Sequence, residues 1–501
     1  MTQKKLSLRL PELIFILLSA VGTMLICTKS SPLYPTNDWL DANCYMTVGR
    51  AMLKGKMPYR DLFEHKGPLL YILHMAASFI SWNSFFGVFL IETAACAWTL
   101  LLAYRTVSRL AGGHPLWAVP VTAFAVYSSG AFSHGDSAEE LCLPLILSTV
   151  LAGLEAVLEK RTLTSRESLL AGAAAGAVLW IKFSLLGPWI GIALFFAVFS
   201  IRTGRPPELL RMALWAAAGA LAVTLPILAY FALCGALPDL FRVYFHDNLF
   251  IYGGGSTGLG SNLIDGWTFF IVFMPVGLSA IYLGTAAFII RREFLTGSYL
   301  LASMVTAFVM TFGGHLSYQY YPLILAAYVP AGLGSLTALI KKRFPRVKPP
   351  GNLWALPLLA VCLAGCFLAS PNVYLMKYSR EDMPQYRFAQ VINSTSDGKI
   401  LNYGFLDGGF YLAADSQPDQ PYFCCNNTGL EDMIKGQKEY ADSGKPDFII
   451  TRSYSMQKEE FPMYRCIGEM SFPYCGRLPT YYLYARLDIA DSAEVNWEKY
   501  N

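Results

Sequence analysis

Charged residues are scarce in this chain, and their scarcity excludes most soluble protein classes. Only 15% of the 501 residues are charged, whereas 54% are hydrophobic. A soluble domain carries about 25% charged residues, so this composition indicates a membrane protein. The formal net charge is only +4, and the basic residues stand in short clusters between apolar runs. We therefore find no nucleic-acid-binding patch and expect no nucleic-acid partner.

Metal-binding cysteine spacings and internal repeats are also lacking. None of the eleven cysteines belongs to a C-x-x-C pair. Cysteines in apolar segments are interpreted as small buried hydrophobic residues, whereas those in the polar C-terminal part could form disulfides in an oxidising compartment. The latter are Cys424, Cys425, Cys466 and Cys475. The two halves of the apolar region differ in loop length and charge, which disfavours an inverted-repeat transporter.

Long apolar runs dominate the first 370 residues. A helix needs about 17 to 25 residues to cross the bilayer core, and we count about eleven such runs. They cover approximately 11–28, 84–104, 116–132, 141–158, 168–181, 184–200, 212–234, 267–290, 297–313, 320–340 and 353–370. The first run has no signal-peptidase-like site after it, so we expect a retained first helix. The pair 168–181 and 184–200 must turn tightly at Lys182.

Basic residues fall in alternate connections between these runs. All of these connections can be cytoplasmic at once, and an odd number of spans then places the C-terminal part outside. The residues concerned are Lys4, Lys5, Arg9, Arg105, Arg109, Lys160, Arg161, Arg166, Arg202, Arg205, Arg211, Arg291, Arg292, Lys341, Lys342, Arg343 and Lys348. The sequence thus predicts a multi-pass integral membrane protein.

From about residue 371 the composition becomes polar. Strand-like runs at 399–405, 446–452 and 480–487 alternate with turn-rich or helical segments. We expect domains at 1–370, the membrane domain, and 371–501, a small extracytoplasmic α/β domain. The tail carries no nucleophile, metal or phosphate-loop motif, so we assign it no catalytic residue.

The first outside connection, about 29–83, holds the strongest local pattern. An amphipathic helix is predicted from near Asp38 to Gly55, and 69–81 is an apolar stretch expected in the interface plane. Asp41 and Tyr45 are four residues apart and share one helix face. A carboxylate there can accept the proton of an acceptor hydroxyl, as a general base must in a single displacement. The alternative is that Asp38 caps the helix and Asp41 complements its N-terminus.

This block resembles the first extracytoplasmic loop of GT-C glycosyltransferases. Protein O-mannosyltransferases and lipid A aminoarabinose transferases carry an Asp, usually Asp-Glu, then an aromatic residue and later a Lys/His-Pro-Pro-type segment. Asp41 matches the acid used at the acceptor, Tyr45 the aromatic residue, and Lys66 with Pro68 the later segment. Ala42 stands where the second acid usually lies, so the chain is more similar to bacterial relatives with a single Asp before Lys-Gly-Pro-Leu-Leu-Tyr. The resemblance implies a GT-C fold, a polyprenyl-phosphate sugar donor and a bacterial plasma membrane.

Two further outside segments supply candidate site residues. Asp136, Glu139 and Glu140 precede an apolar run and could position an acceptor or bind a divalent cation with Asp41. The family resemblance favours Glu139, and the alternative is a helix N-terminus with dipole-complementing acids. The aromatic-rich segment 241–252 resembles a loop that covers the active site in these enzymes, and it could equally be an interfacial helix.

A departing phosphate needs fixed positive charge near it. The candidates are Lys66, Lys182 and His315, all in outside connections close to apolar helix ends. Lys182 stands in an otherwise apolar hairpin, where an ionisable group suggests function, although it could also snorkel to the interface. His315 could instead belong to an aromatic belt with its neighbouring tyrosines. Arg60 and Arg242 are weaker candidates.

These observations predict a GT-C glycosyltransferase with Asp41 as base, transferring a sugar from a polyprenyl-phosphate donor with inversion. The acceptor would be a lipid, a glycan or a protein. The sequence indicates no certain cofactor, and a divalent cation could take part. One alternative is a transporter or flippase of lipid-linked glycans, which predicts ionisable residues in mid-helix. Another is a noncatalytic assembly subunit that uses the tail for protein contacts.

Overall fold

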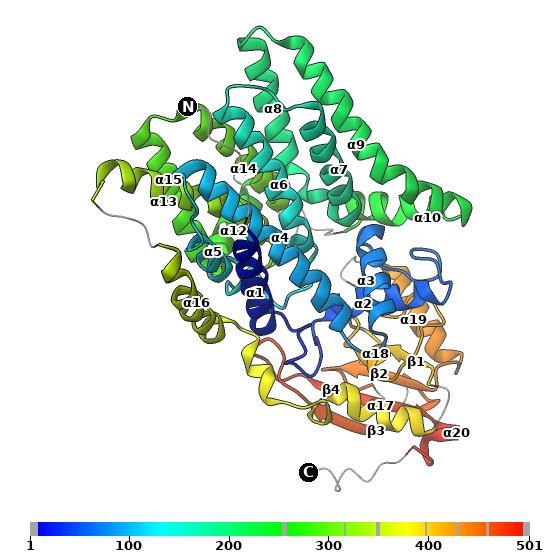
Figure 1. Cartoon of the computed structure of the whole chain (residues 1–501). Coiled ribbons are helices and arrows are strands. Elements are labelled where there is room, and N and C mark those ends of the chain that lie inside the picture. Colours follow the sequence, from blue (N-terminus) through cyan, green and yellow to red (C-terminus); the bar gives the residue numbers. More distant parts are fainter. Residues whose placement is uncertain are drawn as a thin grey trace. The chain divides into compact units, whose positions relative to one another are not determined.

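The protein is mostly helical and divides into two compact units (Figure 1). The computed structural model describes residues 9–252, 258–314, 317–346, 351–395, 398–426, 430–456 and 460–493. Unit 1 comprises Met1–Thr28, Phe89–Leu228 and Gly255–Tyr374, and unit 2 comprises Lys29–Val88, Ala229–Gly254 and Leu375–Asn501. The expected boundary at residue 370 lies close to Leu375, where the last segment of unit 2 begins.

Each of the long apolar helices lies wholly or mostly in unit 1. They are α1 (Leu10–Cys27), α4 (Phe86–Ala111), α5 (Ala118–Tyr127), α6 (Ala138–Leu158), α7 (Ser165–Lys182), α8 (Gly187–Arg202), α9 (Pro206–Leu233), α12 (Leu259–Phe273), α13 (Pro275–Arg291), α14 (Phe294–Phe312), α15 (Val329–Arg343) and α16 (Ala355–Ala369). Short 3-10 turns precede or follow some of them, namely η1 (Phe183–Leu185), η3 (Tyr321–Tyr328) and η4 (Asn352–Trp354). The expected tight turn at Lys182 is confirmed, because α7 ends there and α8 begins at Gly187.

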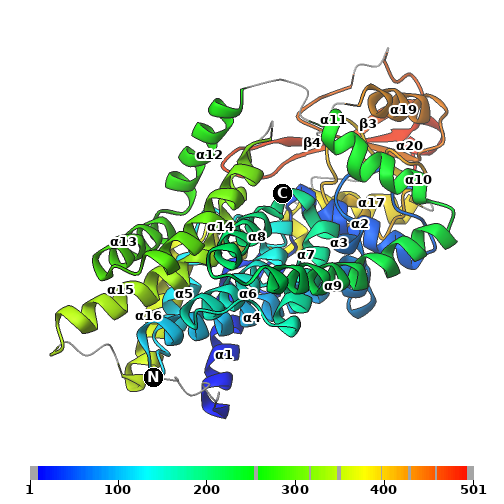
Figure 2. The ribbon, with the colours of Figure 1, turned by 90° about the horizontal axis from the view of Figure 1, so that it is seen from above.

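Fewer helices than expected are long enough to cross a membrane. Among the described residues, eight are long and apolar enough, or nine if α12 and α13 form one span. The angle between these two helices is 104°. Figure 2 shows the change of direction from α12 to α13. The expected runs 116–132 and 184–200 correspond to α5 and α8, which have only 10 and 16 residues. Each of the eleven runs is helical, but α5 and α8 end too early to span by length.

The outer helices expose large apolar side chains in a way that soluble proteins avoid. Along α9, the side chains of Leu210, Leu214, Leu221, Leu225 and Leu233 are all at least half exposed. Contiguous apolar surface of this extent is rare on soluble monomers and marks contact with another apolar phase. Hydrocarbon around α9 accounts for this pattern, as expected of an integral membrane protein.

Small residues let helices of unit 1 approach closely. A Cβ atom added to Gly284 on α13 would lie 2.2 Å from the Cα of Gly332 on α15. Only glycine fits at both positions, as in many helix crossings within membranes. Gly297 on α14 differs, since an added Cβ would meet only Phe288 at an ordinary 3.7 Å.

Unit 2 combines two helices of the first connection with a small sheet from the tail. Its helices are α2 (Leu40–Leu53), α3 (Pro68–Ile80), α10 (Leu237–Leu240), the π-helix η2 (Phe241–Asp247), α11 (Asn248–Phe250), η6 (Arg380–Asp382), α17 (Pro384–Thr395), α18 (Phe410–Ala413), α19 (Glu431–Asp442) and α20 (Leu487–Ala490), and the 3-10 turn η5 (Val373–Lys377) crosses its boundary. Its strands are β1 (Ile400–Asn402), β2 (Phe448–Arg452), β3 (Tyr464–Ser471) and β4 (Thr480–Arg486).

The sheet confirms three predicted strands and adds one that was missed. Its order is β1-β2-β4-β3, with β1 parallel to β2 and the other pairs antiparallel. The runs at 399–405, 446–452 and 480–487 correspond to β1, β2 and β4. Strand β3 lies at the edge, is largely exposed and has a register shift between Cys466 and Gly468. An edge strand of this kind lacks the apolar alternation by which a strand is recognised.

Helix α2 is more buried than an amphipathic surface helix would be. Every residue from Ala42 to Met52 is buried, including Arg50. The Arg50 guanidinium donates to the Tyr411 carbonyl at 3.1 Å, pairs with Asp415 and stacks over the Trp82 ring at 4.5 Å. The tail therefore covers the face of α2 that was expected to meet water.

Candidate functional site

Asp41 and Tyr45 lie on the same face of α2, in the first two turns of the helix. Asp41 is half-buried and Tyr45 is buried. The Tyr45 ring meets the His74 ring of α3 edge to face, with centroids 5.4 Å apart. The capping alternative for Asp38 is wrong, because α2 starts after Trp39 and Asp38 pairs instead with Lys29 at 2.5 Å.

A short loop before α3 arranges three ionisable side chains in sequence. The Lys66 ammonium lies 2.8 Å from His65 Nε2, and His65 Nδ1 lies 3.2 Å from the Glu64 carboxylate. Glu64 also accepts hydrogen bonds from the Lys66 backbone N–H at 3.1 Å and from the Tyr71 hydroxyl. The Tyr59 hydroxyl donates to the Lys66 carbonyl at 2.6 Å. These bonds fix the backbone of Lys66 within the loop, and the residue is half-buried.

The electrostatics of this loop determine its protonation states. Burial has the largest effect on Glu64 and raises its pKa, but the charges of His65 and Lys66 and the Tyr71 hydroxyl outweigh it, so the pKa is well below its usual value. Burial, and after it the Lys66 charge, lowers the pKa of His65. At neutral pH His65 is therefore uncharged, and its Nε2 accepts a hydrogen bond from Lys66.

Asp41 lies on α2, which packs against the helix α3 that follows this loop. Among the charges that act on His65, that of Asp41 raises the pKa of the ring, in opposition to burial. The structure thus brings Asp41, Tyr45 and Lys66 together in unit 2, on α2 and the loop that leads into α3. Sequence reasoning gave Glu64 and His65 no role, because nothing in the spacing indicates how they hold Lys66.

The aromatic-rich segment 241–252 contacts this loop. The Asn248 side chain donates to the His65 carbonyl at 2.7 Å and to the Tyr244 carbonyl at 2.9 Å. The Tyr252 ring lies against the His65 ring, with centroids 4.9 Å apart. The segment was expected to cover an active site, and it packs on the loop that carries Lys66.

In unit 1, Lys182 is paired with one of the predicted acids. Its ammonium lies 2.5 Å from Glu139 Oε1 and 3.8 Å from the centre of the Tyr321 ring. Glu139 is buried, and its second oxygen has no hydrogen-bond partner among the described residues. Snorkelling to the interface therefore does not account for Lys182 by itself, because an acid and an aromatic face hold its ammonium.

The other two predicted acids converge with a third that was not predicted. The Asp136 backbone N–H donates to Glu140 at 2.8 Å and to Glu92 of α4 at 2.7 Å. Glu92 also accepts from the Thr28 hydroxyl at 2.8 Å, and all three acids are buried. Ser137 caps α6, so part of the capping alternative holds. Glu92 could have been found as the one charged residue within the apolar run 84–104.

The remaining candidates contribute less to either unit. His315 lies outside the described residues. Arg60 is exposed and binds Asp61 and the Cys234 carbonyl. No group of three or more His, Cys, Asp and Glu side chains in the described ranges could hold a metal ion, so the possible divalent cation has no such ligand set there.

Two solved structures have the same fold as this chain. Both are ArnT from Cupriavidus metallidurans, one in the apo state with a TM-score of 0.60 and one bound to undecaprenyl phosphate with a TM-score of 0.59. In each case the identity is 13%, over 94% of this chain and 97% of that chain. No protein-family model and no curated protein sequence matches the chain. The resemblance is thus confirmed at the level of the fold: this chain has the GT-C fold of ArnT, a lipid A aminoarabinose transferase.

Proposed function

We propose that this protein is a glycosyltransferase that takes a sugar from a polyprenyl-phosphate carrier. The fold it shares with ArnT supports this class of enzyme, and one of the ArnT structures is bound to undecaprenyl phosphate. The observation that carries the proposal is local. A half-buried carboxylate, Asp41, and a fixed ammonium, Lys66, lie in one cluster of unit 2, on helix α2 and on the loop that leads into α3, and α2 packs against α3.

Such a cluster suits a single displacement at the sugar C1 atom. The acceptor hydroxyl oxygen attacks C1 while the bond from C1 to the phosphate oxygen breaks, which inverts the configuration. Asp41 accepts the hydroxyl proton as general base. The polyprenyl phosphate departs with the bonding electrons, and the Lys66 ammonium stabilises the negative charge that develops on it. Lys66 gives one N–H to His65 and keeps two for the phosphate.

Lys182, in unit 1, is proposed from its own surroundings as a residue that can bind a phosphate. Glu139 takes one of its three N–H donors and the Tyr321 face restrains the ammonium, so the remaining donors have a defined direction. Glu139 then acts by orienting Lys182. Glu140 and Asp136, which bond to each other through the Asp136 N–H, stabilise the start of α6 near this pair.

The reaction is proposed to take place on the extracytoplasmic side. The three segments of unit 2 are the first connection, the connection around 229–254 and the tail, and all three were assigned to the outside from the charge pattern. Side chains of the three segments bond to one another directly, as Thr47 does to Asp407 and Asn248 to the His65 carbonyl, and this grouping supports that assignment.

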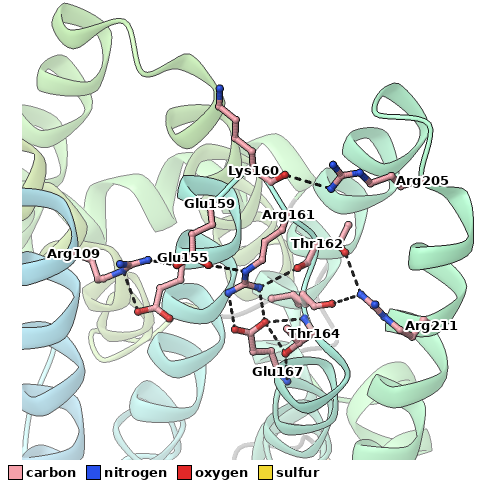
Figure 3. Close-up of polar contacts among 11 residues, drawn as sticks. Arg109, Glu155, Glu159, Lys160, Arg161, Thr162, Thr164, Glu167, Arg205 and Arg211 are labelled. Atoms are coloured by element: carbon pink, nitrogen blue, oxygen red, sulfur yellow. Dashed lines mark hydrogen bonds and ion pairs between the residues drawn. The ribbon is translucent and has the colours of Figure 1, made fainter. Parts of the chain in front are cut away.

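Contacts in unit 1 support the opposite assignment for the basic connections. Arg109 binds Glu155 and Glu159, Arg161 binds Glu159 and Glu167, and Arg211 donates to Thr162 (Figure 3). Residues from the ends of α4, α6, α7 and α9 thus meet in one polar network. These connections were predicted to be cytoplasmic together.

Sugar transfer in membranes tests the proposal. Membranes that contain the full-length protein are supplied with radiolabelled polyprenyl-phosphate sugar, and Asp41→Asn is compared with the native chain. The isosteric amide cannot accept a proton, so we expect transfer to fall by about 100-fold or more, because general bases contribute about 10²–10⁴-fold. Equal transfer by both proteins would remove Asp41 as the base. No transfer by either would favour a transporter or an assembly subunit.

A further inference from the structure

Two buried cysteines from distant parts of the chain face each other in unit 2. The Sγ atoms of Cys44 on α2 and Cys424 in the tail lie 3.6 Å apart, although 380 positions separate them in the sequence. Their exposed fractions are 1% and 2%. A disulfide has sulfur atoms about 2 Å apart, so small rotations of the two side chains bring the atoms within bonding distance.

Rigid neighbours hold both thiols in place. The Asp407 N–H donates to Cys44 Sγ at 3.4 Å, and the Asp407 carboxylate accepts from Thr47, one turn along α2, at 2.5 Å. On the other side, the Tyr411 hydroxyl donates to the Phe423 carbonyl, next to Cys424, at 3.0 Å. The two cysteines therefore face each other because the surrounding bonds fix them.

We propose that Cys44 and Cys424 form a disulfide that ties helix α2, which carries Asp41, to the C-terminal part of the chain. This inference rests on the proposed extracytoplasmic position of unit 2, because disulfides persist in oxidising compartments. The oxidant is a disulfide of a thiol–disulfide exchange protein in that compartment. One thiolate attacks the donor disulfide and releases its first thiol, and the second thiolate attacks the mixed disulfide and releases the other. The donor disulfide gains two electrons and two protons.

Burial determines when the bond forms and how it resists reduction. Burial raises the pKa of both thiols, so neither attacks readily once the unit has closed. The bond therefore forms while unit 2 is folding, and afterwards a reductant cannot reach it. We expect the disulfide to survive a mild reductant in the folded protein. The same reductant should break it once denaturant has unfolded the protein.

The experiment counts thiols in the full-length protein from bacterial cells with an oxidising periplasm. Free thiols are blocked in denaturant with N-ethylmaleimide, disulfides are then reduced, and the released thiols are labelled with a maleimide-linked polyethylene glycol. Cys44→Ser and Cys424→Ser should each carry two labels fewer than the wild type. The matched controls Cys425→Ser, Cys466→Ser and Cys234→Ser should keep those two labels.

Two outcomes would overturn the bond. In the first, the wild-type chain carries no label. In the second, Cys44→Ser and Cys424→Ser keep both labels and one of the control variants loses them. Peptide mapping of the unreduced wild type gives the same answer without any variant. An impermeant maleimide on spheroplasts separates the two proposals, because Cys466 is exposed. If Cys466 is labelled but the disulfide is absent, the proposed function still holds. If Cys466 is not labelled, the result contradicts the extracytoplasmic location on which the disulfide and the proposed function both depend.

Discussion

At the scale of single residues, Lys66 is the group whose charge the proposed chemistry needs most. Lys66→Met removes the ammonium but keeps a side chain of similar length. Loss of one charge-stabilising donor costs about 10²–10³ in turnover, and we expect a loss of that size in sugar transfer. Initial rates at saturating donor measure it. Lys66→Arg is the matched control and should retain a larger share of the rate, since it keeps the positive charge.

His65 should make the stability of unit 2 depend on pH. Its pKa in the folded protein lies below the ordinary value of about 6.5, so the unfolded chain binds a proton more readily. The folded state is therefore favoured above that value and loses stability as the pH falls through 6.5. Glu64 has a lowered pKa and loses its contribution only at much lower pH.

Thermal unfolding of the detergent-solubilised protein between pH 7.5 and about 5 checks this expectation. We expect the unfolding temperature to fall across this range in the wild type and to fall less in His65→Gln, whose amide does not titrate there. Equal slopes for the two proteins would show that His65 is not buried in its neutral form.

At this scale, motif reading could propose site residues but not the partners that the structure gives them. Asp41, Tyr45 and Lys66 could be predicted because they lie within one continuous stretch of sequence. The pairing of Lys182 with Glu139 could not, since 43 positions separate them. Glu92 was missed because it lies within an apolar run. A lone acid in such a run indicates a functional or structural role.

At the scale of helices, the crossing of α13 and α15 depends on the pair Gly284 and Gly332. Gly284→Ala places a methyl group where the opposing backbone lies, so the helices must separate. Overpacking costs about 1–3 kcal/mol, and we expect a lower unfolding temperature. Gly297→Ala on α14 is the matched control, because its new methyl group meets only an ordinary contact. If both variants unfold at the same temperature, the close approach does not hold α13 against α15.

Hydropathy predicted the helices better than their ends. All eleven apolar runs are helical, but the sequence could not reveal that α5 stops after ten residues or that α12 and α13 bend sharply. Such ends depend on neighbouring segments that a local window does not contain. Strand β3 was missed for a related reason, since its partner β4 stabilises it and its own residues carry little pattern.

At the scale of the whole molecule, all three segments of unit 2 should be on one side of the bilayer. The variants Lys54→Cys and Lys435→Cys and the native Cys234 each place a thiol in one of these segments, at exposed or half-exposed positions. In intact spheroplasts, an impermeant maleimide should label all three and leave a cysteine at Lys160 unlabelled until the membrane is permeabilised. Labelling of Lys160→Cys before that step, or protection of any of the other three, contradicts the proposed orientation.

Charge bias predicted which connections share a side of the bilayer. It could not predict that three of these segments form one unit, namely 29–88, 229–254 and 375–501. Hydropathy and periodicity are local properties, whereas this grouping depends on long-range contacts such as Thr47 with Asp407. Only the three-dimensional structure reveals them.

The buried arginine of α2 has a consequence for biogenesis. Arg50 reaches the ribosomal exit early, but its partners Tyr411 and Asp415 are translated near the end of synthesis. Until they arrive, the Arg50 cation lacks its partners and the helix is uncovered, and such incomplete intermediates are prone to aggregate. A nascent chain released prematurely would therefore be a natural substrate for quality-control proteases.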